Sequence, residues 1–532
     1  MRQGRVILLF ILSVLGFALL SPKWNFTFSA WIAPAALLLL GSGQRFWRSF
    51  LLTLVTLFIS GLIANYRVMP FPALFLVPFC LQIAVVNSIP YVAATFLSRY
   101  LDGSLSTLAF PSLAVLVEFL SSLGGGGVWG SIANTQAGNL ALMQLTSVFG
   151  LWGVSFLLYW WAALLEWAYR RRSWRLARIP FALYFVVLAA AFLFGQIRLM
   201  MNPELQGNSV KVAAVSAMNI HALFQIYEDA FGKKMEVNAA ALTQTSPEIT
   251  ELNKGLVVFI ENPSDTKFRH AFAALDAFQD SLFDEAAVHA RAGAKLIVFS
   301  EALMLTIKSK ELQVIEKARQ FSRKNRVRLV LTLGSFLPGK VDFGKKYIEN
   351  KAISINEHGE IENVFFKNKP VPIVEGSVPG DGEIPVMQTD IGRIATSICY
   401  DADFPPLMRK AGKKNADLLV LPSGDWPEVS PFHAEMAKIR AIENGFALLR
   451  PVSNARSIAC DAYGRIVASK EFSKKGITSL IVDLPLNGAP TIYTSLGDIL
   501  PVVCGLVIVM IAATIYLKRK NESHRRVEES AG

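Results

Sequence analysis

Eight long apolar runs interrupt this chain of 532 residues, and they limit what it can fold into more than any other feature. Seven lie in the first 200 residues, near 6–21, 26–41, 50–65, 72–97, 105–123, 147–168 and 179–198, and the eighth covers 499–517. About 20 apolar residues are needed for a helix to cross a bilayer, so the first two runs are near the short limit. The pattern predicts seven membrane helices within 1–204, a separate domain over 205–490, and an eighth helix with a basic tail over 491–532.

Lys and Arg are distributed unevenly among the loops that join these runs. If the N-terminus is cytoplasmic, the short loops on the opposite side contain only Lys23 and Arg67. The cytoplasmic side then contains fifteen, at positions 2, 5, 45, 48, 99, 170, 171, 172, 175, 178, 518, 519, 520, 525 and 526. Because cytoplasmic loops of membrane proteins are enriched in Lys and Arg, we expect 205–490 to lie outside the cytoplasmic (inner) membrane, on its periplasmic side.

The net charge of +12 is explained by these loops, and no compact basic and aromatic surface can be recognised in the sequence. We therefore expect no nucleic-acid partner. Of the four cysteines, Cys80 and Cys504 lie in apolar runs, and Cys399 and Cys460 lie in the polar region. Four scattered cysteines do not indicate a disulfide framework.

The polar region has the pattern of an α/β domain. Helical periodicity covers 272–292, 309–325 and 433–444. Strand-like runs occur at 212–216, 296–300, 327–333, 351–356, 393–398, 417–421, 447–453, 466–469 and 480–482. Many strands with few helices favour an α-β-β-α sandwich, with two packed sheets and helices outside, over a single parallel sheet. The polar segment 232–270 resists assignment, and a lid, an inserted hairpin and a partner surface all remain open.

Three apolar runs in this domain end in residues with reactive side chains. "KLIVFSE" ends in Glu301, "IATSIC" ends in Cys399, and Lys367 follows the extended run in "VFFKNKPVPIVEG". A thiol with a pKa near ~8.5 needs a base or a cationic neighbour to react at neutral pH. A partly buried carboxylate can be that base, and an ammonium group can stabilise the oxyanion that follows attack on a carbonyl. Each residue also has an ordinary interpretation: a packed cysteine, a solvated strand end and a surface turn.

The order and flanking residues of these three positions resemble the nitrilase superfamily of carbon–nitrogen hydrolases. "CYDADFP" is similar to its nucleophile motif, and "KIRAIENGFALLR" and "NARSIACDAYGRI" are similar to segments downstream of it. The membrane part resembles one branch of that superfamily, the apolipoprotein N-acyltransferases, in "VEFLSSLGGGGVWGSIANTQAGN" and "GLWGVSFLLYW". The resemblance implies that Glu301 is the base, Lys367 the oxyanion partner and Cys399 the nucleophile.

The resemblance also implies supporting and substrate-binding residues, which are Glu375, Tyr400, Asp401, Trp426, Trp129 and Gln136. It implies an acyl donor that is a membrane phospholipid and an acceptor that is the N-terminal amine of a lipid-modified cysteine on an apolipoprotein. It gives no reason to expect a metal or a cofactor, and we expect a monomer. The alternative is a membrane-anchored amidase or nitrilase that uses water. Asp401, where the acyltransferases usually have Glu, and the "RAIEN" segment favour that alternative.

Overall fold

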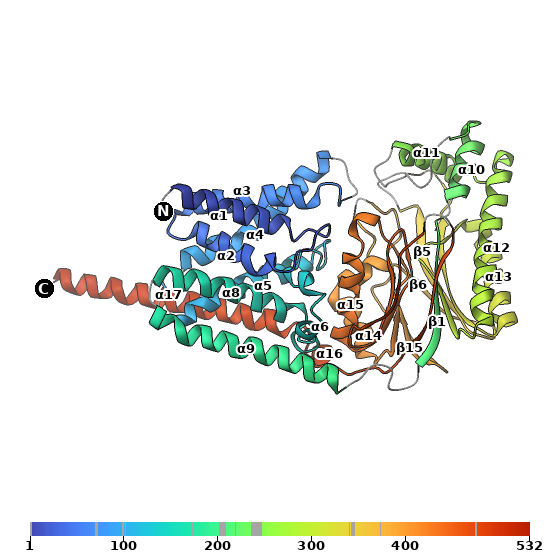
Figure 1. Cartoon of the computed structure of the whole chain (residues 1–532). Helices are drawn as coiled ribbons and strands as arrows, with labels where there is room; N and C mark the ends of the chain where they lie inside the picture. The colour runs from blue at the N-terminus through green and yellow to red at the C-terminus, as the bar shows by residue number, and fades with distance from the viewer. Residues whose placement is uncertain are drawn as a thin grey trace. The chain divides into compact units, whose positions relative to one another are not determined.

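The computed structural model describes residues 3–69, 73–97, 100–101, 103–171, 174–201, 209–218, 220–235, 247–339, 341, 346–372, 374–473 and 476–531. The chain divides into two compact units (Figure 1). The first unit, which holds the apolar helices and is called the membrane unit, comprises Met1–Met201 with Leu496–Gly532, and the second unit comprises Asn202–Ser495. The predicted boundary at 204/205 lies outside the described residues.

Each predicted apolar run forms a helix in the membrane unit. They are α1 (Gln3–Ala18), α2 (Ser29–Gly41), α3 (Phe46–Asn65), α4 (Ala73–Leu97), α5 (Ala109–Ser122), α8 (Leu151–Arg171), α9 (Trp174–Met200) and α17 (Ile499–Ala531). Among the described residues, five helices are long and apolar enough to cross a membrane: α3, α4, α8, α9 and α17. Helices α1, α2 and α5 are apolar but shorter, at 16, 13 and 14 residues.

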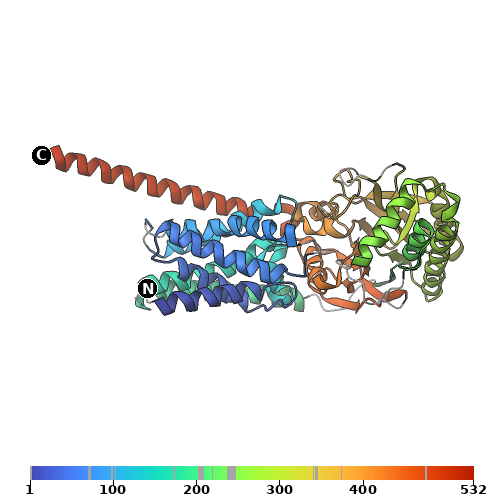
Figure 2. The ribbon, with the colours of Figure 1, turned by 90° about the horizontal axis from the view of Figure 1, so that it is seen from above.

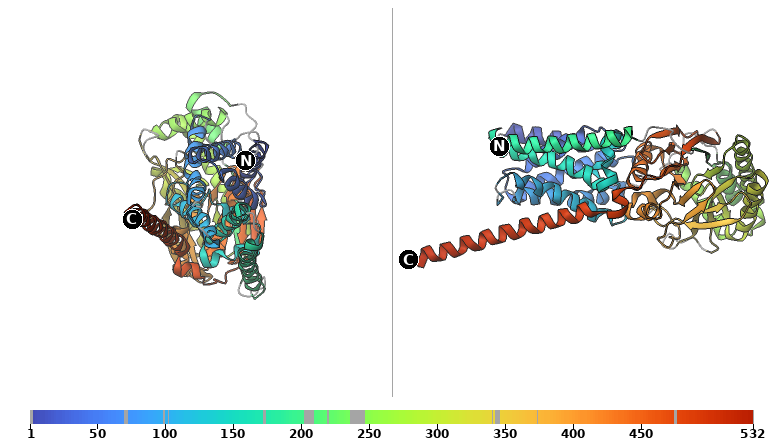
Figure 3. Two further views of the ribbon diagram at one scale, coloured as in Figure 1. Left: turned by 90° about the vertical axis from the view of Figure 1, so that its left-hand side faces the viewer. Right: turned by 90° about the horizontal axis from the view of Figure 1, so that it is seen from below.

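Both chain termini lie at the same end of the membrane unit (Figures 1 and 2). Helix α17 continues beyond the other helices of this unit (Figure 3). The sequence predicted an apolar helix that ends at 517 and a tail after it, but the helix continues to Ala531. Its polar extension "NESHRRVEES" is rich in Glu and Arg, which favour helix without requiring apolar surroundings.

The long uncharged loop between α5 and α8 is partly anchored. It contains the turn η2 (Ile132–Gln136) and two short helices, α6 (Leu140–Met143) and α7 (Thr146–Phe149). All five residues of η2 are buried, whereas Gly124 and Gly126 are exposed. The glycine-rich part of this loop is therefore the part that faces outward from the unit.

Two main sheets form the centre of the second unit. The first has seven strands: β15 (Thr478–Pro485), β1 (Ser209–Ser216), β2 (Leu296–Phe299), β4 (Arg328–Phe336), β5 (Ile348–Ile355) and β6 (Ile361–Phe366) in that order, with β3 (Met304–Ile307) paired to β4. The second has six: β14 (Ile466–Lys470), β13 (Ser457–Cys460), β11 (Ala447–Arg450), β9 (Leu418–Val420), β8 (Gly392–Thr396) and β7 (Val386–Thr389). Two short strands, β10 (Ser423–Gly424) and β12 (Val452–Ser453), pair in parallel; β10 follows β9 in the chain, and β12 follows β11.

The side chains of β1 show how the layers are held together. Val212 and Ala214 belong to the core that includes residues of the second sheet, such as Leu418. Their neighbours Ala213 and Val215 pack on the opposite side, in the core that includes residues of the helices α12 (Arg269–Arg291) and α13 (Glu311–Asn325). Successive strand residues point to opposite sides of a sheet, so an unbroken apolar run is buried on both.

The second sheet is covered by α14 (Pro405–Lys413) and α15 (Phe432–Asn444), as Figure 1 shows. The order helix, sheet, sheet, helix confirms the predicted α-β-β-α sandwich. All nine predicted strand runs form strands. Strands β3, β6, β7, β10 and β13 were not among the predicted runs. All but β6 have at most four residues, which is too short for a clear alternation, and β6 was noted only as the extended run before Lys367.

The unassigned segment 232–270 contains a helix. Helix α11 (Pro247–Glu261) packs with α10 (Ile220–Phe231), and Phe259 of α11 lies within 5.0 Å of Phe268, measured between ring centroids. The hairpin alternative is therefore wrong for the apolar run 255–261. Residues 236–246 lie outside the described residues.

Candidate active site

The three predicted catalytic residues follow the ends of three strands. Glu301 lies two residues after β2, Lys367 directly follows β6, and Cys399 lies three residues after β8. The Nζ atom of Lys367 donates a hydrogen bond of 2.7 Å to Oε1 of Glu301. The backbone of Gly424 links the other two, because its N–H donates to Oε2 of Glu301 (2.8 Å) and its carbonyl oxygen lies 3.8 Å from Sγ of Cys399.

Lys367 is completely buried between two carboxylates. Besides Glu301, it donates to Oε1 of Glu375 at 2.5 Å. Burial alone would lower the pKa of Lys367, but Glu301 and Glu375 together raise it above its usual value. Burial raises the pKa of the Glu375 carboxyl group. Lys367 is therefore a fixed cation, which is the property that an oxyanion partner needs.

Glu301 is held by neighbours that the sequence did not single out. Its Oε1 also accepts a hydrogen bond of 2.7 Å from Nδ2 of Asn350, which lies on β5. The N–H of Lys367 donates to the carbonyl oxygen of Asn350 at 2.9 Å. A polar residue within the run that forms β5 was the only local signal. Asn350 and Gly424 orient the Glu301 carboxylate, so that it cannot swing away from the lysine.

Cys399 occupies a strained position in the backbone. Its φ of 48° lies in the left-handed region, which is unfavourable for a side chain with a Cβ atom, and its N–H donates to the carbonyl oxygen of Pro422 at 2.9 Å. Strain of this kind clusters at functional sites, where the surrounding fold maintains it. Cys399 is 4% exposed, and burial raises the pKa of its thiol. The resting thiol is therefore neutral and requires a base.

Asp401 connects the lysine segment to the nucleophile turn. Its carboxylate accepts hydrogen bonds from the N–H of Lys369 (2.7 Å), the N–H of Ile398 (3.1 Å) and the hydroxyl of Ser397 (3.2 Å). The side chain is fully buried, and burial raises its pKa to about 6. Asp401 therefore joins the segment of Lys369 to the residues that directly precede Cys399.

Tyr400 and Trp426 lie beside these groups. The ring of Tyr400 contacts that of Phe404 edge-on, with 5.3 Å between centroids, and burial raises the pKa of the phenol. Trp426 is half-buried and directly precedes the turn η7 (Pro427–Val429). Tyr400 directly follows Cys399, and Trp426 directly follows Asp425, whose Oδ1 lies 3.9 Å from Sγ of Cys399.

Trp129 and Gln136 lie in the membrane unit. The Oε1 atom of Gln136 accepts a hydrogen bond from Nε1 of Trp31 (3.3 Å), and its Nε2 donates to the carbonyl oxygen of Thr27 (3.1 Å). Gln136 therefore fixes its loop to the N-terminal end of α2. Trp129 is half-buried, and its carbonyl oxygen accepts a hydrogen bond from Asn134.

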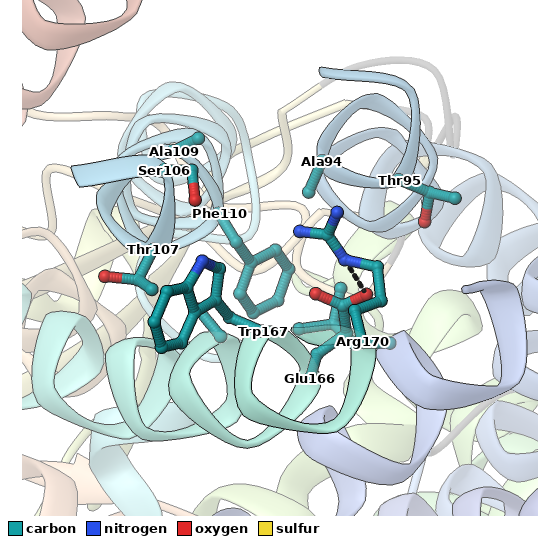
Figure 4. Close-up of a pocket in the computed structure, with 11 residues that line it drawn as sticks. Ala94, Thr95, Ser106, Thr107, Ala109, Phe110, Glu166, Trp167 and Arg170 are labelled. Atoms are coloured by element: carbon teal, nitrogen blue, oxygen red, sulfur yellow. Dashed lines mark ion pairs between the residues drawn. The ribbon is translucent and has the colours of Figure 1, made fainter. Parts of the chain in front are cut away.

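A small pocket in the membrane unit is lined by residues of α2, α4, α5, α8 and the turn η1 (Ser104–Leu108) (Figure 4). Its charged residues, Glu166 and Arg170, form an ion pair of 2.9 Å, and Ser42 donates to Glu166 at 2.7 Å. The other lining residues are apolar or carry a hydroxyl group, and none of them is a cysteine. Within the described part of the chain, no group of three or more His, Cys, Asp or Glu side chains is arranged to hold a metal ion.

Comparison with known proteins matches the two regions to two family models. Residues 12–164 match the apolipoprotein N-acyltransferase N-terminal domain, and residues 240–490 match the carbon-nitrogen hydrolase family. Apolipoprotein N-acyltransferase 1 of Treponema denticola is 23% identical, and the alignment covers 95% of each chain. The apolipoprotein N-acyltransferase of Rhodopseudomonas palustris is 24% identical over 76% of this chain and 73% of its own.

Among solved structures, an amidase from Nesterenkonia sp. is similar, with 18% identity, a TM-score of 0.37, and coverage of 53% of this chain and 93% of the amidase. Two family models in this order, on the membrane region and on the α/β region, together with relatives aligned along both, agree on one assignment. The chain is similar to the apolipoprotein N-acyltransferases along both of its regions: residues 12–164 belong to their N-terminal domain family, and residues 240–490 belong to the carbon-nitrogen hydrolase family.

Proposed function

We propose that this protein transfers a fatty acyl chain from a membrane phospholipid to the N-terminal amine of a lipid-modified cysteine on an apolipoprotein. The observation that supports it most directly is the burial of Lys367 between Glu301 and Glu375, next to a thiol on a strained turn. The relatives supply the substrates, since they are named for N-acyl transfer to apolipoproteins.

In the first step, Glu301 removes the proton from the Cys399 thiol, and the sulfur attacks the ester carbonyl of the phospholipid. Lys367 stabilises the tetrahedral oxyanion. The C–O ester bond then breaks, and Glu301 returns the proton to the departing lysophospholipid hydroxyl. A thioester between Cys399 and the acyl chain remains. Removal of one oxyanion donor typically costs about 2.7–4 kcal/mol of transition-state stabilisation.

In the second step, the acceptor amine attacks the thioester carbonyl. Glu301 accepts a proton from the attacking amine and delivers it to the sulfur as the C–S bond breaks. An amide forms, and the Cys399 thiol is restored. Both steps use the same three side chains, so no further catalytic group is required.

The architecture of the chain is consistent with these substrates. Both are anchored in a bilayer, and the chain joins the nitrilase-like domain to apolar helices. The uneven distribution of Lys and Arg favours a multi-pass protein of the bacterial inner membrane with the nitrilase-like domain on the periplasmic side. We expect the enzyme to act as a monomer.

Two features of the sequence favoured water as the alternative acceptor, and the structure gives both of them a role in the scaffold. Asp401 was a reason to consider an amidase, but its carboxylate binds backbone N–H groups of Lys369 and Ile398 and belongs to the scaffold of the site. The "RAIEN" segment lies on α15, where Arg440 and Glu443 form a buried ion pair of 3.1 Å. Neither feature presents a group that would activate water.

The experiment that tests the proposal is intact-mass measurement of the purified full-length chain after incubation with phospholipid vesicles. We expect a mass increase of one fatty acyl group, absent in Cys399→Ala and retained in the control Cys460→Ala, which removes a buried thiol of the second sheet. A synthetic lipopeptide with a diacylglyceryl cysteine should then remove the adduct and gain an N-acyl group. An unmodified wild-type protein that releases ammonia from simple amides would overturn the proposal.

A further inference from the structure

Four buried charged or titratable side chains form a cluster behind Cys399 that the two-step mechanism does not use. They are Asp403, Asp425, His433 and Arg450, each no more than 7% exposed. They come from four elements: Asp403 ends the turn η6 (Cys399–Asp403), Asp425 follows β10, His433 is the second residue of α15, and Arg450 is the last residue of β11.

His433 connects the two carboxylates. Its Nδ1 lies 2.8 Å from Oδ1 of Asp425 and 3.1 Å from Nη2 of Arg450, and its Nε2 lies 3.1 Å from Oδ1 of Asp403. An imidazole between two carboxylate oxygens can satisfy both only when both ring nitrogens carry a proton. Burial and the neighbouring Arg450 guanidinium would lower the pKa of His433, but Asp425 and Asp403 outweigh them and raise it to about 9. His433 is therefore an imidazolium at neutral pH.

Asp425 is the member of the cluster that reaches the sulfur. Its Oδ1 lies 3.9 Å from Sγ of Cys399, and its two oxygens accept hydrogen bonds of 3.0 and 2.9 Å from Nη2 of Arg450. A bare carboxylate at this distance would oppose formation of a thiolate, because like charges repel strongly in a buried site. The other groups that face the sulfur are Glu301, which has the same effect, and Lys367, which opposes it.

We propose that Asp403, Asp425, His433 and Arg450 act as a charge-neutral quartet in which His433, as an imidazolium, cancels the effect of Asp425 on the Cys399 sulfur. Two carboxylates and two cations sum to zero, so the quartet fixes the position of the thiol through Asp425 without imposing a negative field on it. Loss of the His433 charge leaves a net charge of −1 beside the sulfur. His433 is in this sense a positioning residue, since it acts on the sulfur through Asp425.

This inference rests on the proposed role of Cys399 as the nucleophile, and its test needs no acyl donor. The full-length chain is treated with iodoacetamide from pH 6 to 10, and alkylation of Cys399 is followed by peptide mass mapping. At pH 7 we expect His433→Gln to slow alkylation about tenfold, which corresponds to a rise of about one unit in the thiol pKa. The difference in alkylation rate between wild type and His433→Gln should vanish near pH 10, because His433 of the wild type has then lost its charge as well.

Charge compensation distinguishes this role from a structural one. Asp425→Asn alone leaves the cluster with a net charge of +1 and should react at least as fast as wild type at pH 7. The double variant Asp425→Asn/His433→Gln is again neutral and should return to within about threefold of the wild-type rate. The surface control Arg456→Gln, which removes one member of the exposed pair Arg456–Glu471, should have no effect.

If all three cluster variants are slowed equally at every pH, the quartet is only structural and the inference is wrong. It is also wrong if His433→Gln leaves the pH profile unchanged. If the alkylation results hold but no acyl adduct forms with phospholipid, the quartet stands and the proposed function fails. The two proposals can therefore fail separately.

Discussion

The structure gives Asp401 a different role from the one that the sequence suggested. In the sequence, Asp401 stands where the acyltransferases usually have Glu, and this difference favoured water over an amine as the acceptor of the acyl group. In the structure its carboxylate accepts backbone hydrogen bonds from Lys369 and Ile398, and so joins the lysine segment to the nucleophile turn. Two short chain segments that hold Lys367 and Cys399 are thereby fixed relative to each other. Asp401 therefore does not distinguish an amine from water as the acceptor of the acyl group.

The raised pKa of His433 gives a prediction for how the stability of the protein depends on pH. The pKa of His433 is raised to about 9 in the folded protein, from about 6.5 in an unfolded chain. This contribution is fully present below pH 6.5 and is lost as pH rises through 9; a shift of this size corresponds to about 3 kcal/mol. We expect the melting temperature of wild type to fall between pH 7 and 10 by more than that of His433→Gln.

Thermal melts of the full-length protein in detergent measure this effect. The comparison between the two proteins removes the contribution of lysines and tyrosines, which also titrate near pH 10. Parallel pH curves for wild type and His433→Gln would contradict the imidazolium assignment.

Among the elements, α15 ends with a glycine whose conformation and surroundings both exclude a side chain. Gly445 has a φ of +72°, and a Cβ atom added there would lie 1.6 Å from the carbonyl oxygen of Ala489. The N–H of Ala489 in turn donates to the carbonyl oxygen of Gly445 at 2.7 Å. The close approach therefore couples the end of α15 to the segment that leads toward α17.

We expect Gly445→Ala to destabilise the protein by at least about 2 kcal/mol, because left-handed strain and a backbone clash add. Gly293→Ala is the matched control: Gly293 follows α12 with a φ of +91°, and nothing lies within 4 Å of an added Cβ atom. It should cost only about 1 kcal/mol. Thermal melts of both variants test this, and equal losses would mean that the contact with Ala489 yields without cost.

For the molecule as a whole, the distribution of charge makes a prediction about sidedness. All four native cysteines are buried, and Cys399→Ala removes the one proposed to be reactive, so a cysteine introduced at an exposed position of that variant can be labelled selectively. We expect Ser469→Cys, on the exposed part of β14, to react with a membrane-impermeant maleimide in intact cells whose outer membrane has been opened. Asn521→Cys, at an exposed position of α17, should react only after lysis. The reverse pattern would contradict the predicted orientation.

Much of the fold followed from local patterns. Apolar runs predicted all eight long helices of the membrane unit, and nine strand runs predicted most of both sheets. The strands β3, β6, β7, β10 and β13 and the helices α10, α11 and α14 were not predicted. Most of these strands have two to four residues, which give too little periodicity, and the run 255–261 in α11 has no clear period. Glu301, Lys367 and Cys399 were recognisable because each follows the end of a strand and because the order of the three resembles a known superfamily.

Hydropathy and charge were thus determined by the sequence itself, since both are sums over neighbouring residues. Only the tertiary structure decided which side chains meet. Asn350 and Gly424 hold Glu301, Asp425 lies beside the thiol and His433 lies beside Asp425, yet none of them is adjacent to its partner in the chain. Strand pairing and the packing of the two sheets bring them within 3 to 4 Å. These contacts depend on the register of distant segments, which no local pattern contains.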